Sequence, residues 1–422
     1  MSQLLTTPVF PAAVFQLENG LTIIHQYISA TPVVVVDVWV RAGAMCEPEP
    51  WYGMAHFLEH MIFKGTSAIP PGVFDYVIEN LGGTTNAATS HDYAHFFLTT
   101  AASYLEDTVP YLAELLLNPA IPDEEFILER DVVREEIRCA YDDPDWIGFQ
   151  ALGESIYQQH PYGRSVLGSE TDLMQYTPEA MRCFHHAHYQ PENMTVVIVG
   201  GIAQAAAIEI VSQAFQEFAP RCECPHTEIV LTEPLLAGIR RQEIYLPRLE
   251  QARLLMAWTG PGVDQLRNAY GLDLLSVLLS EGRSSRLVRE LREEQHLVQG
   301  IASNFSLQRD SSLFTITAWL ESENLERVES LIRTHLEDLQ TTLITPAELA
   351  RCKRVLCNDY AFSTETPSQL AGLYGYYNTI AQAELAVIYP EQIQSFPAEE
   401  LQLLTQQYLS PYSYAVTVLK PC

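Results

Sequence analysis

Strand-like and helix-like patterns of apolar residues alternate along the first half of the chain. Residues 14–25 have Asn19-Gly20 at their centre, a dipeptide that favours a hairpin turn. Residues 32–41 are β-branched and almost continuously apolar, which predicts a well-buried strand. Further helices are predicted over 53–63, 71–81, 102–117 and 122–140, and further strands over 86–99 and 194–200.

The second half of the chain repeats this plan. Its pattern predicts strands at 254–259 and 313–320, a helix at 269–279, and a second helix that follows the strand at 313–320 and ends at about 339. The two halves also end alike, because 189–199 and 408–418 both consist of a tyrosine, a turn with proline and a terminal strand. Duplication of one unit explains this repeat better than chance. The predicted fold is therefore α+β, with two homologous domains, each a mostly antiparallel sheet packed with helices.

The length of 422 residues suits two domains of about 200 residues each. Prolines at 220, 225 and 234 interrupt the segment between the two halves, which predicts a linker. The predicted divisions are 1–218 for the N-terminal domain, 219–240 for the linker and 241–422 for the C-terminal domain.

The chain is strongly acidic, with a formal net charge of −29 from 24 basic and 53 acidic residues. A field of that sign repels nucleic acid and anionic lipid, so neither is an expected partner. It would attract basic peptides, although acidity can also serve only to keep a protein in solution. No apolar run reaches the ~18 residues of a membrane span, and the first residues lack a signal-peptide pattern. A soluble, cytoplasmic protein is therefore predicted.

The eight cysteines are scattered, and none forms a C-x-x-C pair. A chain of this length does not need disulfides to fold, which favours free thiols in a reducing compartment. Cys222 and Cys224 lie one residue apart and could bind a metal, but loop thiols without a role are the simpler interpretation.

The motif His56-Phe57-Leu58-Glu59-His60 indicates a metal site. Residues four apart share one face of a helix, so His56 and His60 can direct two imidazoles at one ion. Neutral imidazole suits zinc, and the order H-x-x-E-H is that of the inverted zinc peptidases, with Glu59 beside the metal. The alternative is two ordinary histidines on an amphipathic helix.

A catalytic zinc needs a third protein ligand, and the predicted helix at 122–140 offers carboxylates. Glu129 and Glu136 are seven residues apart and therefore face the same way. A buried pair of carboxylates is costly unless it binds something. The alternative is that these acids line a solvated face of an acidic protein.

Residues 53–66, GMAHFLEHMIFKGT, resemble the active-site helix of the pitrilysin-type zinc peptidases. They are most similar to the mitochondrial-processing-peptidase-like branch and its bacterial relatives. The resemblance continues through 82–87, 129–137, 189–194 and 281–287. It thus covers most of the chain and implies a peptidase whose two domains form half of a clamshell chamber.

The resemblance also implies roles for individual residues. One Zn²⁺ per chain would be held by His56, His60 and Glu136, and Glu129 would be the catalytic-site acid that supports them. Glu59 would be the general base that activates the zinc-bound water and later passes the proton to the leaving amine. Asn86 and Ala87 would lie on an edge strand that pairs with the backbone of an extended substrate.

The sequence departs from the family pattern at one position of the C-terminal domain. The family presents an arginine, and a tyrosine seven residues later, to hold the substrate carbonyl. Here Arg292 is present but Gln299 replaces the tyrosine. Either Gln299 substitutes adequately in a monomer or homodimer, or a homologous zinc-free partner chain supplies the pair. The partner chain is the slightly favoured interpretation.

The predicted activity is therefore that of a zinc endopeptidase that processes or clears extended or unfolded peptides inside a chamber. Three alternatives stay open at this point. The chain could be a non-catalytic scaffold of the family, although such chains typically lose the H-x-x-E-H residues. It could be a catalytic subunit that is active only with its partner chain. It could also be a different zinc hydrolase with the same metal geometry.

Overall fold

Two compact units make up the chain. The computed structural model describes residues 9–49, 51–224, 233 and 236–422. The first unit comprises Met1–Arg138, Arg164–Glu228 and Ser363–Ile388, and the second comprises Cys139–Gly163, Ile229–Phe362 and Tyr389–Cys422. Each unit is α+β, which confirms the predicted fold class.

The first unit contains a six-stranded sheet in the order β1-β2-β6-β3-β5-β4. Its strands are β1 (Ala13–Gln16), β2 (Thr22–Tyr27), β3 (Val33–Val40), β4 (Thr84–Thr89), β5 (Ala94–Ala101) and β6 (Met194–Gly200). Only the β2–β6 pair is parallel among these neighbours. The predicted hairpin joins β1 to β2, and Gly20 in its turn has a φ of 100°. The predicted strand at 86–99 is wrong in extent, because a polar turn at 90–93 divides it into β4 and β5.

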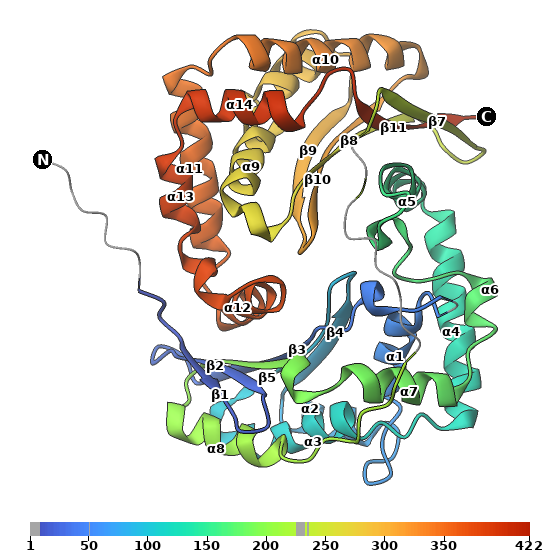
Figure 1. Ribbon diagram of the computed structural model, residues 1–422, viewed down its shortest axis with the longest axis vertical. Coiled ribbons are helices and arrows are strands. Elements are labelled where there is room, and N and C mark those ends of the chain that lie inside the picture. Colours follow the sequence, from blue (N-terminus) through green and yellow to red (C-terminus); the bar gives the residue numbers. More distant parts are fainter. Residues whose placement is uncertain (1–8, 50, 225–232, 234–235) are drawn as a thin grey trace, which may run out of the picture. The chain divides into compact units, whose positions relative to one another are not determined.

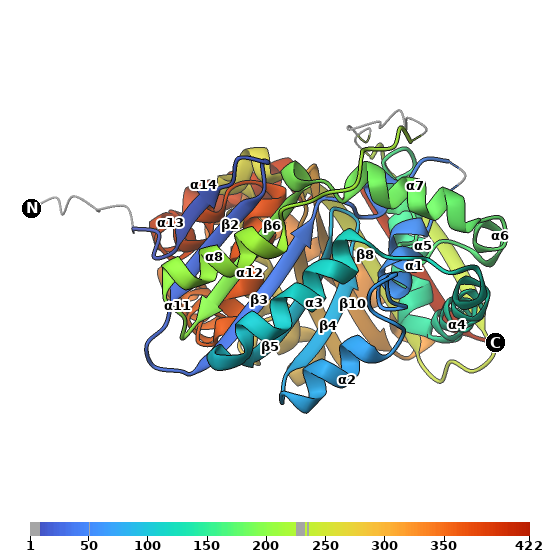
Figure 2. The ribbon, with the colours of Figure 1, turned by 90° about the horizontal axis from the view of Figure 1, so that it is seen from below.

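Helices cover both faces of this sheet. One face packs against α1 (Met54–Ile62), α2 (Val73–Asn80), α3 (Leu105–Leu117), α4 (Asp123–Asp142), α7 (Pro178–His188) and α8 (Gln204–Ala214). The other face packs against α12 (Pro367–Ile380), as Figures 1 and 2 show from two directions. Along β3, Val34 and Val36 face the first layer, whereas Val35 and Trp39 face α12. Burial on both faces explains why β3 reads as a continuous apolar run.

The second unit contains a five-stranded sheet in the order β7-β11-β8-β10-β9. Its strands are β7 (Ile239–Leu246), β8 (Ala252–Pro261), β9 (Gly300–Leu307), β10 (Ser311–Leu320) and β11 (Tyr414–Pro421). Its longer helices are α5 (Pro144–Ile156), α9 (Leu266–Ser280), α10 (Leu325–Thr341), α11 (Pro346–Phe362) and α14 (Ala398–Tyr408), together with a π-helix at Val288–Glu294.

The order of strands confirms the predicted duplication. The strands β2-β6-β3-β5-β4 of the first sheet correspond in order to β7-β11-β8-β10-β9 of the second, and each set has one parallel pair at the same position. The two similar segments at 189–199 and 408–418 lead into β6 and β11, which occupy equivalent places. The repeat seen in the sequence is therefore a repeat of topology.

Each half of the chain contributes one helix to the unit built mainly by the other half. Helix α5 packs on β8 and β11 of the second unit, and Gln242 donates from β7 to the carbonyl of Ala151 at 2.6 Å. Helix α12 packs on β3 and β6 of the first unit, where a Cβ at Gly375 would collide with the indole of Trp39. The predicted divisions at 1–218, 219–240 and 241–422 stay a prediction, and part of the linker, 225–232 and 234–235, lies outside the described residues.

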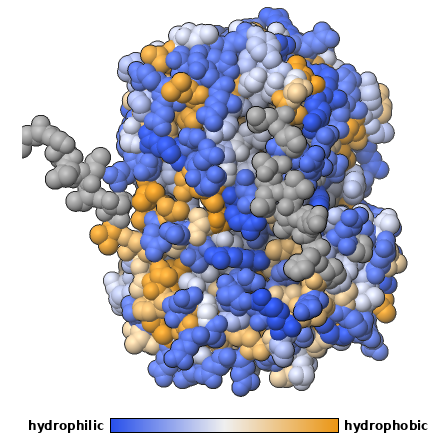
Figure 3. Space-filling view, viewed as in Figure 1, coloured by the Kyte–Doolittle hydropathy of each residue, from blue (hydrophilic) through white to orange (hydrophobic). Residues whose placement is uncertain are grey.

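The expectation of free thiols is wrong for two of the cysteines. Cys183 of α7 and Cys222 form a disulfide, with their Cα atoms 5.5 Å apart. Cysteine spacing alone does not predict this pair, because the bond depends on how the segment after α8 returns to α7. The face drawn in Figure 3 is mostly hydrophilic, in keeping with the net charge. Within the described residues, no helix has the length and apolar character needed to cross a membrane.

Candidate metal centre

Helix α1 carries the H-x-x-E-H motif and is fixed at its start by a buried acid. The carboxylate of Glu47 accepts hydrogen bonds from the amides of Gly53 and Ala55, both at 2.8 Å. These amides have no partner within the helix, so Glu47 holds the first turn in place. Burial raises the pKa of Glu47 to about 8. The sequence pattern did not single out Glu47, because an acid six residues before a helix looks like any polar loop residue.

Three side chains converge at the centre of the site. His56 and His60 lie one turn apart on α1, and Glu136 reaches them from α4. The Nε2 atoms of His56 and His60 are 3.6 and 3.4 Å from the two carboxylate oxygens of Glu136. One ligand atom from each of the three residues lies within 4.8 Å of the others.

These separations fit a single zinc ion. Nitrogen and oxygen ligands bind zinc at about 2.0–2.1 Å, so two tetrahedral ligands lie about 3.3 Å apart. The two carboxylate contacts of Glu136 are close to that value. Two imidazoles and one carboxylate are also the donor set of catalytic zinc sites with an open position. His56, His60 and Glu136 could therefore hold a zinc ion with little movement.

Glu129 lies two turns before Glu136 on α4 and supports this group. Its Oε1 lies 2.9 Å from Nδ1 of His60, and its Oε2 lies 2.5 Å from Nζ of Lys64. A hydrogen bond at Nδ1 places the proton there and leaves the Nε2 lone pair of His60 free for a metal. The side chain of Glu129 is only 10% exposed, so the alternative of a solvated acidic face does not describe it.

The electrostatics of the group favour a cation. Burial lowers the pKa of His60, but its hydrogen bonds to Glu129 and Glu136 outweigh burial and raise the pKa to about 9. The hydrogen bonds from His56 and His60 hold the pKa of Glu136 well below its ordinary value. In the metal-free site the two carboxylates are therefore balanced by Lys64 and a protonated His60, and a divalent ion would take the place of the His60 proton.

Glu59 lies on the same turn of α1 but outside this ligand group. Its Oε2 accepts a hydrogen bond of 2.6 Å from the hydroxyl of Thr89, the last residue of β4. Within the described residues, no protein group is hydrogen-bonded to Oε1 of Glu59. That oxygen can therefore accept a proton from a bound water.

Strand β4, which follows α1 and α2 in the chain, lies at one edge of the six-stranded sheet. Asn86 and Ala87 lie in its middle, paired with Phe97 and Phe96 of β5. The amide of Ala87 donates to Oδ1 of Asn86 at 2.9 Å. In the part of the chain that the structure describes, the other side of β4 has no strand beside it, so Asn86 and Ala87 lie on an edge strand and their role in binding substrate stays a prediction.

The two residues predicted to assist from the C-terminal domain lie in the second unit. Arg292 is part of the π-helix at Val288–Glu294, and its guanidinium donates to Glu293 at 2.7 and 2.9 Å. Gln299 is exposed, and its backbone amide donates to Trp319 in β10. The role of Arg292 and Gln299 in holding substrate stays a prediction.

The chain matches two family descriptions along its length. Residues 22–170 match the insulinase family, peptidase family M16, and this match contains all the residues of the candidate metal centre. Residues 175–356 match the peptidase M16 inactive domain. The zinc protease PqqE of Helicobacter pylori is 28% identical over 408 residues, which cover 96% of this chain and 92% of that protein. The uncharacterized zinc protease YmxG of Bacillus subtilis is 26% identical and covers 83% of this chain and 84% of that protein.

Solved structures agree with these matches. The crystal structure of a protease from Helicobacter pylori superposes with a TM-score of 0.91 at 27% identity, covering 97% of this chain and 99% of that one. A peptidase M16 inactive domain from Pseudomonas fluorescens shares the fold, with a TM-score of 0.86, 19% identity, and coverage of 98% and 99%. Both domains of one family are thus matched in order, and the chain belongs to peptidase family M16, the pitrilysin-like family whose relatives named above are called zinc proteases.

Proposed function

We propose that the chain is a zinc-dependent endopeptidase that hydrolyses extended or unfolded peptides. One observation carries this proposal: the donor atoms of His56, His60 and Glu136 converge at zinc-like separations, with Glu59 on the same helix. A scaffold subunit would have no need to keep four such groups in this geometry. The nearby edge strand β4 favours a peptide over a small molecule.

A bound zinc ion would polarise the scissile carbonyl and make water a stronger nucleophile. The residues of the chain supply the rest. Glu129 keeps the Nδ1 proton of His60 in place. The Oε1 atom of Glu59 takes a proton from the attacking water and later gives it to the leaving amine nitrogen. The hydroxyl of Thr89 binds Oε2 of Glu59 and so orients its carboxylate.

Substrate binding would use β-augmentation. An extended peptide can add to the open side of β4, where main-chain hydrogen bonds at 84–89 provide affinity without demanding a particular sequence. The amide of Ala87 would then exchange Oδ1 of Asn86 for a substrate carbonyl. The net charge of −29 favours basic peptides, by raising their concentration near the protein.

The proposed assembly is a dimer, which would complete the chamber. It would be a homodimer if Gln299 can replace the usual tyrosine beside Arg292. It would be a heterodimer if a homologous zinc-free chain supplies that pair. The second arrangement would make this chain a processing subunit that is inactive alone.

The test is zinc content and cleavage of an unstructured basic peptide by the pure chain, beside Glu59→Gln. We expect bound zinc in both proteins and a loss of activity of about 10²–10⁴-fold in the variant. Glu135→Gln is the matched control, because the side chain of Glu135 is 68% exposed on α4.

The other outcomes are informative. Bound zinc without activity in either protein would point to a missing partner chain, and activity should then appear on adding a homologue that carries the arginine–tyrosine pair. A wild-type chain without zinc would contradict the assignment of His56, His60 and Glu136.

A further inference from the structure

Three cysteine sulfurs meet in the first unit, away from the H-x-x-E-H motif. Cys183 on α7 is bonded to Cys222, and Sγ of Cys224 lies 3.7 Å from Sγ of Cys183. Cys224 is half-buried and packs against the core of the first unit. The segment that follows α8 therefore returns to α7 and brings two thiol groups to a third.

The separation of the unbonded pair is that of two ligands of one metal ion. Thiolates bind zinc at about 2.3 Å, so two sulfurs of a tetrahedral zinc site lie about 3.8 Å apart. Cys183 and Cys224 are already at that distance. Cys222 is two residues from Cys224 and is held beside Cys183 by their bond, so its sulfur would be near the other two when that bond is opened.

We propose that, in the reduced protein, Cys183, Cys222 and Cys224 form a second metal site, which binds a thiophilic d¹⁰ cation such as Zn²⁺. The site is distinct from the candidate catalytic centre because its donors are sulfurs. Three thiolates suit soft cations, whereas the two imidazoles and carboxylate of the other centre are harder donors.

The sequence around these cysteines offers one histidine as a further ligand. Cys183 and His186 form a C-x-x-H pair on α7, and Cys222 and Cys224 form a C-x-C pair. Residues three apart lie on one face of a helix, so His186 is the residue of α7 that could supply a fourth ligand. Cys₃His is an established composition of structural zinc sites.

The disulfide and the metal are two states of the same three residues. Reduction of the Cys183–Cys222 bond takes two electrons and two protons from a thiol reductant, two molecules of which are oxidised to one disulfide. Binding of the cation then releases the three thiol protons to solvent. Burial raises the pKa of the Cys224 thiol, so this sulfur needs a cation to lose its proton at neutral pH.

Either state would tie the segment after α8 to α7. Helix α7 contacts α1, which carries His56 and His60. The disulfide or the metal would therefore be attached to a helix that packs against the helix of the candidate catalytic centre. A reducing compartment would favour the metal and an oxidising one the disulfide.

The experiment uses Cd²⁺ as the probe, because its thiolate complexes absorb in the ultraviolet whereas its imidazole and carboxylate complexes do not. The full chain carrying His56→Gln and His60→Gln is reduced with a phosphine and titrated with Cd²⁺. We expect a sulfur-to-cadmium absorption band that saturates at one ion per chain. The same protein oxidised with oxidised glutathione should give no band.

Variants then assign the ligands. Cys224→Ser should weaken Cd²⁺ binding by roughly tenfold or more and leave the disulfide able to form. Cys222→Ser should do the same and remove the disulfide. Cys139→Ser is the control, because Cys139 is an exposed free cysteine on α4 and should change nothing.

Two results would overturn the proposal. One is a reduced chain without the absorption band. The other is a band that persists at full affinity in Cys224→Ser, a variant that does not touch the disulfide and should fold normally. Loss of peptidase activity plays no part in this readout, so failure of the proposed function would not be mistaken for failure of the second site.

Discussion

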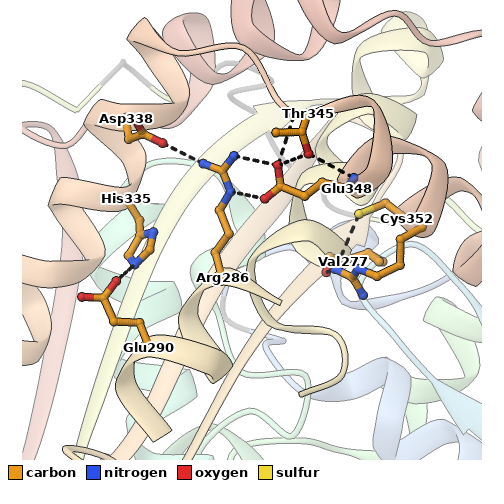
Figure 4. Close-up of polar contacts among 9 residues, drawn as sticks. Val277, Arg286, Glu290, His335, Asp338, Thr345, Glu348 and Cys352 are labelled. Carbon is orange, nitrogen blue, oxygen red and sulfur yellow. Dashed lines mark hydrogen bonds and ion pairs between the residues drawn. The ribbon is translucent and has the colours of Figure 1, made fainter. Parts of the chain in front are cut away.

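Each unit contains a cluster of charged side chains, and the two clusters differ in how the acids are neutralised. In the second unit, Arg286 donates to Glu348 at 2.8 and 3.2 Å and to Asp338 at 2.8 Å (Figure 4). Glu348 also accepts from the hydroxyl and the amide of Thr345. In the first unit, Glu129 and Glu136 face two imidazoles and one lysine.

The two clusters differ in whether the protein itself supplies a hydrogen-bond donor for every acid. A guanidinium has five donors in a rigid fork, so Arg286 can satisfy two acids at once and close its cluster. A neutral imidazole whose Nδ1–H already donates to a carboxylate has only an acceptor lone pair left at Nε2. The side chains of His60 and Glu136 therefore bring two acceptors together, an arrangement that is stable only with a shared proton or a metal. A closed cluster stabilises the fold, and an open one binds a ligand.

The largest expected effect is on metal binding at the open cluster. Glu136→Gln removes one of three ligands, so zinc affinity should fall by more than the ~100-fold that loss of an outer partner can cost. Thermal stability of the metal-free chain should fall only slightly, because the side chain of Glu136 is 44% exposed and solvent screens its ion pairs with the imidazoles. Isothermal titration and thermal unfolding after chelation measure the two effects, with Glu135→Gln as the control. A metal-free Glu136→Gln chain that loses as much stability as Arg286→Met would mean that this cluster is structural too.

The closed cluster should show the opposite response. Arg286→Met leaves Glu348 and Asp338 without their cation, and we expect a loss of about 2–4 kcal/mol in the free energy of unfolding, because Asp338 is partly solvated. Zinc bound per folded chain should not change. Urea unfolding checks this, beside Arg289→Met as the control, because the side chain of Arg289 is 57% exposed. Equal stability of Arg286→Met and Arg289→Met would contradict the comparison.

A smaller effect is expected at the acid that orients His60. Glu129→Gln keeps an oxygen that can accept from Nδ1 of His60 but removes the charge, so zinc affinity should fall by about 10–100-fold. The effect should be clearly smaller than that of Glu136→Gln. If the two substitutions weaken zinc binding equally, Glu129 is itself a ligand and the assignment of Glu136 as the third ligand needs revision.

The two clusters should also respond to pH in different ranges. In the metal-free centre the pKa of His60 is raised to about 9, so zinc must displace a proton below that pH. Affinity should then fall about tenfold for each unit that the pH drops below 9. The same shift stabilises the metal-free fold fully below about pH 6.5, and this stabilisation is lost as the pH rises through 9.

The pH response of the closed cluster serves as the contrast. The hydrogen bonds from Arg286 hold the pKa of Glu348 at about 2. Its stabilisation is therefore complete above about pH 4.5, the ordinary value, and is lost only as the pH falls through 2. Zinc affinity followed from pH 6 to 9 should change while the stability due to Arg286 and Glu348 stays constant. A zinc affinity that is flat across this range would contradict the shared proton at His60.

Local spacing explains which parts of the site could be predicted. His56, Glu59 and His60 lie within two turns of one helix, and Glu129 and Glu136 within another, so the rules of helix geometry were enough to group each set. That the two helices meet came from the resemblance to a family. The cap by Glu47 and the bond between Cys183 and Cys222 could not be predicted, because each depends on a tertiary contact that no periodicity records.

In the fold, too, some elements could be predicted from local sequence and others could not. The strand at 32–41 was recognisable because burial on both faces makes it continuously apolar. The pattern of α12 could not reveal which sheet it covers, since an apolar helix face fits either. The turn within 86–99 was missed because Ser90 and His91 are less distinctive turn residues than asparagine or glycine.

The exchange of helices has a consequence for synthesis on the ribosome. The sheet of the first unit is complete once β6 ends at Gly200, but the helix that covers its second face ends only at Ile380. At a synthesis rate of about 5–20 residues per second, that face stays uncovered for roughly 10–40 s. During this interval Val35, Trp39 and Val199 are exposed apolar surface. A nascent chain of this protein therefore carries an uncovered apolar sheet face through much of the synthesis of its second half.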